Sequence, residues 1–181
     1  MVYVFLADGF EEIEALAPID LLKRAGIKVT TVGVGSTTPS GSHGVTVRAD
    51  ISEDLFLPQD SIEAILLPGG MPGTNNLELS ETVRRAIRLA SEEEITVAAI
   101  CAAPIILAHS GMLAGKKATV FPQFKDELGK SYKDSDVVYD TPFLTARAAG
   151  SAIDFALRLI EIIKNKKTAK QVAEAIYYKK H

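Results

Sequence analysis

The sequence predicts an α/β fold: a flavodoxin-like three-layer sandwich with a mostly parallel sheet and helices on both faces. Four short apolar runs have the length and composition of strands buried on both faces: Val2–Leu6, Lys28–Val34, Ala64–Leu67 and Ile95–Ile100. Helical patterns lie between these runs, and strands that alternate with helices pair in parallel. A chain of 181 residues that is 47% hydrophobic suits one well-buried core. We therefore expect a single domain over residues 1–181.

The clearest predicted helix spans Glu12–Ala25, a largely apolar segment that Gly26 ends. Apolar residues at helical spacing predict three further helices: Thr82–Ser91, Ala103–Ser110 and Ser151–Lys164. In the last of these we expect the Ser151 side chain to cap the helix, with Asp154 three residues later as its partner. Shorter apolar runs predict three minor strands, of which the last two form a hairpin: Val45–Arg48, Val137–Tyr139 and Phe143–Thr145.

The single cysteine of the chain lies where the fourth predicted strand gives way to a helix. Ala99 and Ala103 place small side chains two residues before and after Cys101, as a sharp strand-to-helix turn requires. This turn resembles the nucleophile elbow of α/β hydrolases with sulfur in place of oxygen, and we expect the following helix to lower the pKa of the thiol. Cys101 is therefore a candidate nucleophile. The alternative is a small buried hydrophobic residue, the usual environment of a free cysteine.

In parallel sheets of this kind, ligands bind beyond the carboxyl ends of the strands. Three segments follow predicted strands and are expected at that edge: Asp8–Glu12, Pro68–Gly73 and Cys101. Gly69 and Gly70 let the backbone approach a ligand closely, so the amides of Gly70 and Ala102 are candidates for an oxyanion hole beside the sulfur. The alternative for the two glycines is an ordinary turn. Their spacing fits neither the phosphate loop nor the dinucleotide fingerprint.

Three glutamates lie in the first turns of the first predicted helix. Glu11 and Glu12 are interpreted as solvated partners of the helix dipole. Glu14 lies on the helix face that carries buried apolar residues, so we expect it to point toward the strand ends. A carboxyl group buried beside a thiolate stays protonated and donates a hydrogen bond to sulfur, or carries protons to and from a substrate.

The charge composition excludes some classes of partner. A net charge of -3, from 20 basic and 23 acidic residues, gives no electrostatic footprint for nucleic acid or a membrane surface. The lysines from Lys164 to Lys170 are interpreted as a solvated face. One cysteine cannot form an intrachain disulfide, and the N-terminal residues lack the pattern of a signal peptide. We therefore expect a cytoplasmic protein that does not enter a membrane.

Four segments, in this order, resemble motifs of the ThiJ/PfpI superfamily, most closely its DJ-1 branch of Parkinson-disease-associated deglycases: Ala7–Glu14, Arg24–Thr30, Leu66–Gly70 and Ala98–Pro104. The resemblance implies a flavodoxin-like sandwich, a homodimer, and Cys101 as the reactive cysteine. It also implies that Glu14 hydrogen-bonds the sulfur and that Gly70 and Ala102 are the amide donors. Arg24 matches an arginine near the dimer interface of that branch.

Several positions depart from the family pattern. The protease-like branch carries histidine where this chain has Ala102, so we do not expect a Cys-His proteolytic dyad. Phe121 stands where the DJ-1 branch has a histidine near the pocket, which leaves general acid-base work to Glu14. His43 matches an arginine that reaches the neighbouring subunit's pocket in that branch; the alternative is a solvated loop histidine. We see no clustered histidines or carboxylates, and expect neither a metal nor a cofactor.

Two functions fit these residues. The first is a cofactor-independent cysteine enzyme acting on reactive dicarbonyls or their early protein adducts, of the glyoxalase III type (methylglyoxal to lactate) or the deglycase type; the resemblance implies this substrate class. The second is a redox sensor or stress chaperone in the oxidative stress response, in which Cys101 is oxidised to a sulfinic acid. A peptidase or amidase is a third possibility, disfavoured by Ala102.

Overall fold

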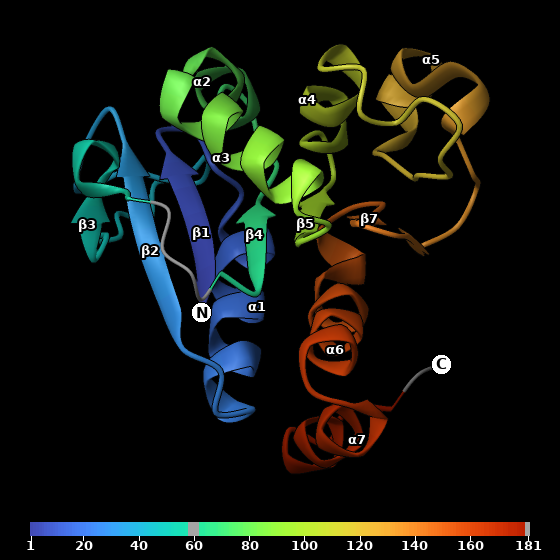
Figure 1. Ribbon diagram of the computed structural model, residues 1–181. Helices are drawn as coiled ribbons and strands as arrows, with labels where there is room; N and C mark the ends of the chain where they lie inside the picture. The colour runs from blue at the N-terminus through green and yellow to red at the C-terminus, as the bar shows by residue number, and fades with distance from the viewer. Residues whose placement is uncertain (58–61, 180–181) are drawn as a thin grey trace.

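The computed structural model describes residues 1–57 and 62–179, and its strands form one seven-stranded sheet (Figure 1). The strand order is β3-β2-β1-β4-β5-β7-β6, and only the edge pair β6/β7 is antiparallel. The strands span these residues: β1 Val2–Ala7, β2 Val29–Val34, β3 Ile51–Ser52, β4 Ala64–Leu67, β5 Thr96–Ile100, β6 Val137–Asp140 and β7 Phe143–Ala146.

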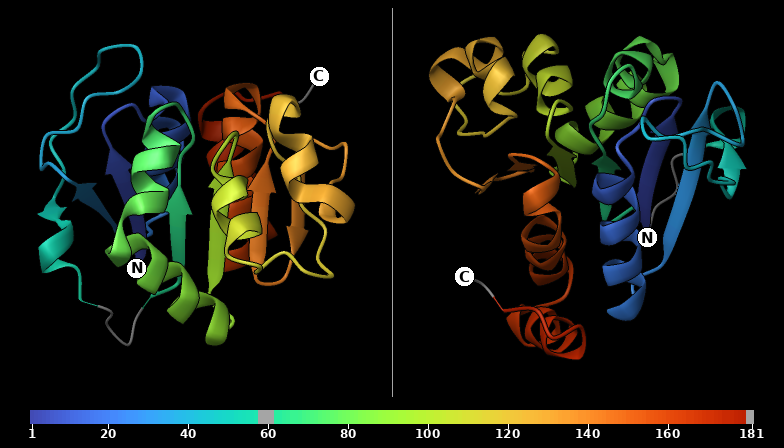
Figure 2. Two further views of the ribbon diagram at one scale, coloured as in Figure 1. Left: turned by 90° about the horizontal axis from the view of Figure 1, so that it is seen from above. Right: turned by 180° about the vertical axis from the view of Figure 1, so that it is seen from behind.

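Helices cover both faces of this sheet, as the views in Figures 1 and 2 show. One face carries α2 (Gly73–Leu79), α3 (Glu81–Glu92), α4 (Pro104–His109) and the short α5 (Lys125–Leu128). The other face carries α1 (Glu12–Arg24), α6 (Ala152–Ile163) and α7 (Lys166–Ala175), with α6 packed between α1 and α7. The predicted flavodoxin-like three-layer sandwich is confirmed.

The sheet separates two hydrophobic cores, and alternate residues of each central strand enter them. In β1, Val2, Val4 and Leu6 pack beneath α1 and α6, whereas Tyr3 and Phe5 pack beneath the helices of the opposite face. This alternation follows from the two-residue period of a strand. Because helices cover both faces of the sheet, every residue of β1 is buried and its sequence is an unbroken apolar run.

The four main predicted strands agree with the structure to within one residue at each end, and the β6/β7 hairpin is confirmed. Val45–Arg48 is not a strand: it lies in the loop between β2 and β3, where an isolated bridge joins Ser40 to Thr46. Its backbone is engaged elsewhere, because the Val45 amide donates to the Glu12 carboxylate.

The predicted cap of α6 is also wrong. The short 3₁₀ helix Ala149–Ser151 runs directly into α6, so Ser151 already has near-helical dihedrals, φ -98° and ψ 2°. Its side chain makes no capping hydrogen bond. A cap residue needs extended backbone to turn its oxygen toward the first free amides, and the 3₁₀ turn removes that geometry.

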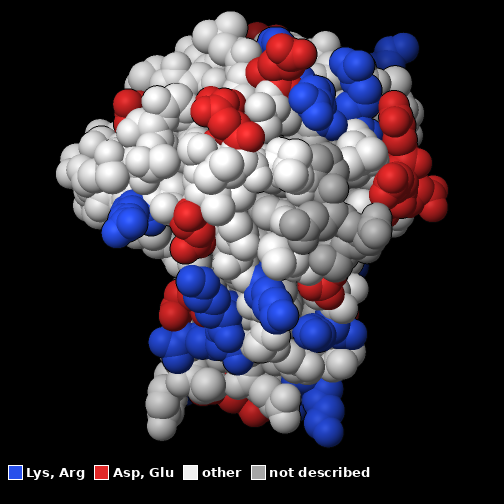
Figure 3. Space-filling model, turned by 60° about the vertical axis from the view of Figure 1, so that its left-hand side comes forward, with Lys and Arg blue, Asp and Glu red and all other residues white. Residues whose placement is uncertain are grey.

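Helix α7 was not predicted, although the interpretation of its lysines is confirmed. Lys166, Lys167 and Lys170 are exposed, while Ala169 and Val172 pack against α6. Acidic and basic side chains both occur on the face drawn in Figure 3, with Lys and Arg gathered toward its lower end. Among residues 1–57 and 62–179, no helix has the length and apolarity to span a bilayer.

Candidate active site

Cys101 lies immediately after β5 in a backbone conformation that residues other than glycine rarely adopt. Its φ is +63°, in the left-handed region. The Cys101 amide donates to the carbonyl oxygen of Ala146 at 2.9 Å, and its own carbonyl accepts from the Phe121 amide at 2.8 Å. These two hydrogen bonds hold the strained turn, and Ala99 and Ala103 are fully buried on either side of it. The predicted strand-to-helix elbow is therefore present.

Glu14 reaches the sulfur from the first turn of α1. Its side chain is 1% exposed and hydrogen-bonds the Cys101 side chain, while the Gly69 amide donates to Glu14 Oε2 at 2.9 Å. A Cβ atom at Gly69 would lie 2.6 Å from Glu14 Oε2 and 2.7 Å from Cys101 Cβ. Only glycine leaves room at this position for the carboxyl group and the cysteine to meet.

Two backbone amides complete the site. The amides of Gly70 and Ala102 hydrogen-bond the sulfur. Gly70 has φ +89°, and a Cβ atom there would lie 2.7 Å from the carbonyl carbon of Phe10. The loops after β1, β4 and β5 thus converge at one edge of the sheet, as the sequence predicts.

Burial raises the pKa of Glu14 to about 7, and the negative charge of Glu11 adds to this effect. Hydrogen bonds from Cys101, the Gly69 amide and the Ala149 amide act in the opposite direction. At neutral pH about half of the Glu14 carboxyls therefore keep their proton. The Ala149 amide was not anticipated from the sequence, because nothing in an Ala-Gly pair 135 positions downstream marks it as a partner of Glu14.

The predicted lowering of the Cys101 pKa is wrong. Burial raises the pKa of the Cys101 thiol above its ordinary range, and the Glu14 carboxylate raises it further; the Ala102 and Gly70 amides lower it. Helix α4 is only six residues long and begins at Pro104, so its dipole acts weakly on the sulfur. Charge repulsion disappears when Glu14 is protonated, so the proton of the pair decides whether a thiolate forms.

Phe121 and Arg24 occupy different places relative to this site. Phe121 is next to it, because its amide donates a hydrogen bond to the Cys101 carbonyl. The residue is 38% exposed, and the centroid of its ring lies 6.4 Å from that of Phe124. Arg24 lies at the opposite end of α1 from Glu14, exposed and paired with Asp20 at 2.7 Å. Arg24 is therefore no part of the Cys101 site within one subunit.

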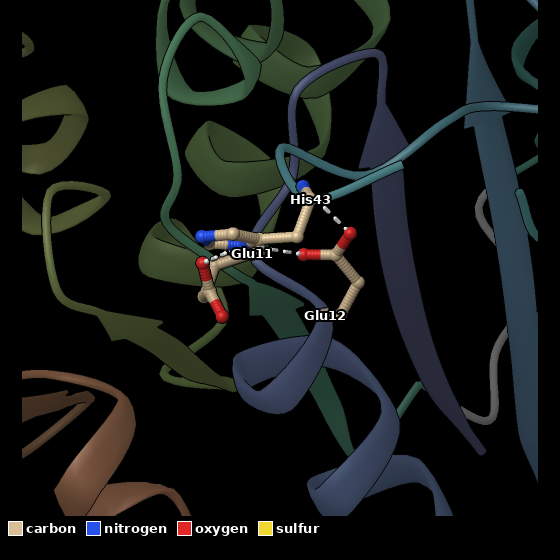
Figure 4. Close-up of side chains that lie close together, drawn as sticks. All are labelled: Glu11, Glu12 and His43. Atoms are coloured by element: carbon tan, nitrogen blue, oxygen red, sulfur yellow. Dashed lines mark hydrogen bonds and ion pairs between the residues drawn. The ribbon is translucent and has the colours of Figure 1, made fainter. Parts of the chain in front are cut away.

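His43 folds back onto the start of α1 (Figure 4). Its Nδ1 atom lies 3.2 Å from Glu11 Oε2 and 3.1 Å from Glu12 Oε2, while the ring remains exposed. Hydrogen bonding to Glu12 raises the pKa of His43, and the charges of Glu11 and Glu12 act in the same direction. The expectation that histidines and carboxylates do not cluster is wrong, because the β2–β3 loop brings His43 to residues 31 positions away.

Glu12 is also not the solvated residue that the sequence predicts. Its side chain is 10% exposed and accepts hydrogen bonds from the amides of His43 and Val45. Burial alone would raise the pKa of Glu12, but these hydrogen bonds, together with those from its own amide and the His43 ring, lower it to about 2. Consecutive glutamates at a helix start carry no signal that one of them anchors a distant loop.

His109 is the last residue of α4 and is held by glutamates. Its Nδ1 lies 2.5 Å from Glu78 and its Nε2 lies 3.3 Å from Glu127, and the hydrogen bond to Glu78 raises the pKa of His109. Within the described residues, both histidines thus pair with glutamates rather than with Cys101. This arrangement is consistent with the expected lack of a Cys-His dyad.

We expect Gly69→Ala to damage the site severely, because the added Cβ atom must displace Glu14 or Cys101. Overpacking of this kind costs about 1–3 kcal/mol of stability. Gly150→Ala is the matched control, since a Cβ atom there meets nothing within 4 Å. Thermal unfolding and thiol titration of both variants test this expectation; equal behaviour of the two would mean that the close approach at Gly69 is not required.

Comparison with known proteins places this architecture in a family. The model of the DJ-1/PfpI family matches residues 1–162. Protein dj-1beta of Drosophila melanogaster is 36% identical over 177 residues, covering 96% of this chain and 94% of that protein. A deglycase of Pyrococcus abyssi is 30% identical over 166 residues, covering 90% of this chain and 99% of that protein.

Solved structures agree with this placement. Oxidised DJ-1 of Toxoplasma gondii superposes with a TM-score of 0.95 at 34% identity, covering 99% of this chain and 98% of that one. The crystal structure of Drosophila melanogaster DJ-1beta gives a TM-score of 0.94 at 35% identity, with coverage of 99% and 98%. The chain that carries this half-buried cysteine and buried glutamate belongs to the DJ-1/PfpI family.

Proposed function

We propose that this chain is a cofactor-independent cysteine enzyme that acts on reactive dicarbonyls, such as methylglyoxal, or on their early protein adducts. The observation that carries the proposal is the Glu14 carboxyl group, buried and hydrogen-bonded to the Cys101 sulfur. A nucleophile with a proton carrier in direct contact is the arrangement that such chemistry needs. Similarity to a protein named as a deglycase supports the substrate class.

The first step is nucleophilic addition. With the proton on Glu14, the Cys101 thiolate attacks the aldehyde carbon of methylglyoxal, and the carbonyl electron pair moves to oxygen. The amides of Gly70 and Ala102, which hydrogen-bond the sulfur, are positioned to stabilise this oxyanion. Glu14 then donates its proton to the oxygen, and the product is a hemithioacetal with Glu14 ionised.

The second step moves a proton between neighbouring carbons. The Glu14 carboxylate removes the proton of the thiol-bearing carbon, and the electron pair forms an enediolate with the adjacent carbonyl. Glu14 returns a proton to that adjacent carbon, the hydroxyl proton of the first carbon passes to the enediolate oxygen, and the first carbon becomes the carbonyl of a thioester. Water cleaves the thioester to lactate and regenerates the thiol, so the sequence needs no external oxidant or reductant.

The turnover of methylglyoxal in D₂O tests this proposal. We expect lactate to form at least about 100-fold faster than with a small thiol at equal thiolate concentration, the usual minimum for positioned acid-base catalysis. The lactate is expected to carry deuterium at C2, because a carboxyl proton exchanges with solvent. A rate no faster than the small thiol would refute the enzyme. Lactate without deuterium would assign the transfer to a hydride shift instead of Glu14.

A redox sensor is the second candidate, since a relative with a TM-score of 0.95 was solved in an oxidised form. In this case peroxide oxidises the Cys101 thiolate to a sulfinic acid, and altered partner binding is the output. A cytosolic location, where thiols are kept reduced, suits both the dicarbonyl enzyme and the redox sensor. Slow dicarbonyl turnover together with stoichiometric oxidation of Cys101 by dilute peroxide would favour the sensor.

We also propose that the chain is a homodimer that pairs through the outer face of α1. Ile13 is 55% exposed and Leu16 is 37% exposed. Asp20 and Arg24 follow on the same face at helical spacing. An apolar stripe that ends in an ion pair suits an interface between copies. This placement gives Arg24 the interface role that the sequence resemblance implies.

Sedimentation equilibrium at micromolar concentration is expected to give twice the 19.4 kDa mass of one chain. Ile13→Glu is expected to shift the protein to monomer without unfolding it, because a charge in a buried interface is costly. Leu79→Glu is the matched control, since Leu79 is a 73% exposed leucine on another helix. A monomeric parent protein would remove this interface.

A further inference from the structure

Three side chains from two distant segments present ligand atoms to a common point (Figure 4). Glu11 and Glu12 come from the start of α1, and His43 comes from the loop between β2 and β3. The His43 Nδ1 atom lies 3.2 Å from Glu11 Oε2 and 3.1 Å from Glu12 Oε2, and the three ligand atoms all lie within 4.8 Å of one another. Ligand atoms this close together can be bridged by one ion.

The Ser42 hydroxyl adds a fourth potential ligand atom beside these three. Ser42 Oγ lies 3.1 Å from Glu11 Oε2, 3.4 Å from Glu12 Oε2 and 3.1 Å from His43 Nδ1. Ligands about 2.0–2.1 Å from a tetrahedral zinc ion stand about 3.3–3.4 Å from one another. The 3.1–3.4 Å distances that involve Ser42 Oγ or His43 Nδ1 are therefore close to those between ligands around one zinc ion, and the two carboxylates present ligand oxygens within 4.8 Å of each other.

The loop is built around the Glu12 carboxylate and holds it in this orientation. The amides of His43 and Val45 donate to Glu12 Oε1 at 2.8 Å and 3.3 Å, which leaves Oε2 to face the histidine. A Cβ atom at Gly41 would overlap the Glu12 carboxyl group, so glycine permits this close approach. Hydrogen bonds to the outer atoms of ligands fix their direction and are typical of metal sites.

His109 provides a contrast within the same chain. It also contacts two glutamates, but Glu78 lies against Nδ1 and Glu127 against Nε2. The two carboxylates are therefore on opposite sides of the ring and do not converge on one ion. In the His43 cluster both carboxylates approach the same nitrogen, Nδ1. A metal ion that takes the place of the proton on this nitrogen can therefore bind the imidazole and both carboxylates.

We propose that Glu11, Glu12 and His43, with Ser42 as fourth ligand, form a binding site for a divalent transition metal ion, for which Zn²⁺ is the best match. One imidazole nitrogen combined with carboxylate oxygens suits zinc, whereas calcium and magnesium take oxygen ligands in larger numbers. The two carboxylates balance the charge of the ion. The bound ion ties the β2–β3 loop to the start of α1.

Equilibrium dialysis against Zn²⁺ tests the site, with bound metal measured by mass spectrometry. The untagged protein is compared with Cys101→Ala, which removes the thiol as a competing zinc ligand. We expect Cys101→Ala to retain one Zn²⁺ per chain. Adding His43→Ala is expected to weaken binding at least tenfold, and since His43 is exposed its replacement leaves the fold intact. Adding His109→Ala is the matched control and is expected to change nothing.

Co²⁺ gives an independent readout. Bound in place of zinc, it is expected to show the intense visible absorption of tetrahedral coordination, and His43→Ala is expected to abolish this absorption. The site is refuted if Cys101→Ala retains no Zn²⁺ at micromolar concentration, or if His43→Ala and His109→Ala weaken binding equally. Dicarbonyl turnover is not used as a readout, so the result is independent of the proposed enzyme activity.

Discussion

Cys101→Ala is expected to abolish the formation of lactate from methylglyoxal while the fold remains intact. The substitution removes the only sulfur nucleophile of the chain and adds no atoms at a turn whose φ is +63°. The alanine keeps the Cβ atom of residue 101, which packs against Gly69. We expect a loss of activity to the rate of the uncatalysed reaction and a change in stability of no more than about 1–2 kcal/mol.

Lactate formation is the correct readout for this variant, because lysine and arginine side chains consume dicarbonyls without catalysis. Thermal unfolding checks that the fold is kept. Cys101→Ser is the matched variant: it retains a hydrogen-bonding group for Glu14, but a hydroxyl at its ordinary pKa is a far weaker nucleophile. Lactate formation by Cys101→Ala at the parent rate would place the chemistry elsewhere in the molecule.

The sequence predicted the elbow because its requirements are local. Small residues at Ala99 and Ala103 flank Cys101, and an apolar run precedes it; each of these features can be read within nine residues. The inward direction of Glu14 was predicted from helix periodicity, and the structure confirms its burial and raised pKa. Periodicity places a side chain on a face without any knowledge of its partners.

The features that the sequence could not predict depend on distant contacts. Glu12 is buried only because the loop that carries His43 and Val45 closes over it. The pKa of Cys101 is set by the burial of the thiol and by a carboxylate 87 positions earlier, and both raise the pKa that the following helix was expected to lower. Helix α7 has few apolar residues, so α6 rather than its own pattern determines where it packs.

The proton on Glu14 is expected to control the stability of the fold as well as the reactivity of the thiol. Burial raises the pKa of Glu14 from 4.5 to about 7, so the folded protein holds this proton more tightly than the unfolded chain. Its contribution is fully present below about pH 4.5 and is lost as the pH rises through 7. The loss amounts to about 3 kcal/mol, and Glu14→Gln is expected to remove this pH dependence.

Glu14→Gln is expected to separate the two chemical roles of this residue. The amide keeps an acceptor for the Gly69 amide and a donor for the sulfur, but it has no negative charge and transfers no proton. We therefore expect the Cys101 pKa to fall below that of the parent, while lactate formation drops by about 100-fold or more. Glu14→Leu removes the donor as well, so its thiol pKa is expected to lie above that of Glu14→Gln.

Three measurements on the parent protein, Glu14→Gln and Glu14→Leu distinguish these outcomes. They are thiolate absorbance against pH, lactate formation, and chemical unfolding at several pH values. Glu81→Gln is the matched control, because Glu81 is an exposed glutamate in the first turn of another helix. It is expected to leave all three measurements unchanged. Parent-like lactate formation by Glu14→Gln would refute the proton transfer and favour the redox sensor. A thiol pKa that rises in Glu14→Gln would contradict the repulsion between carboxylate and thiolate that the buried pair implies.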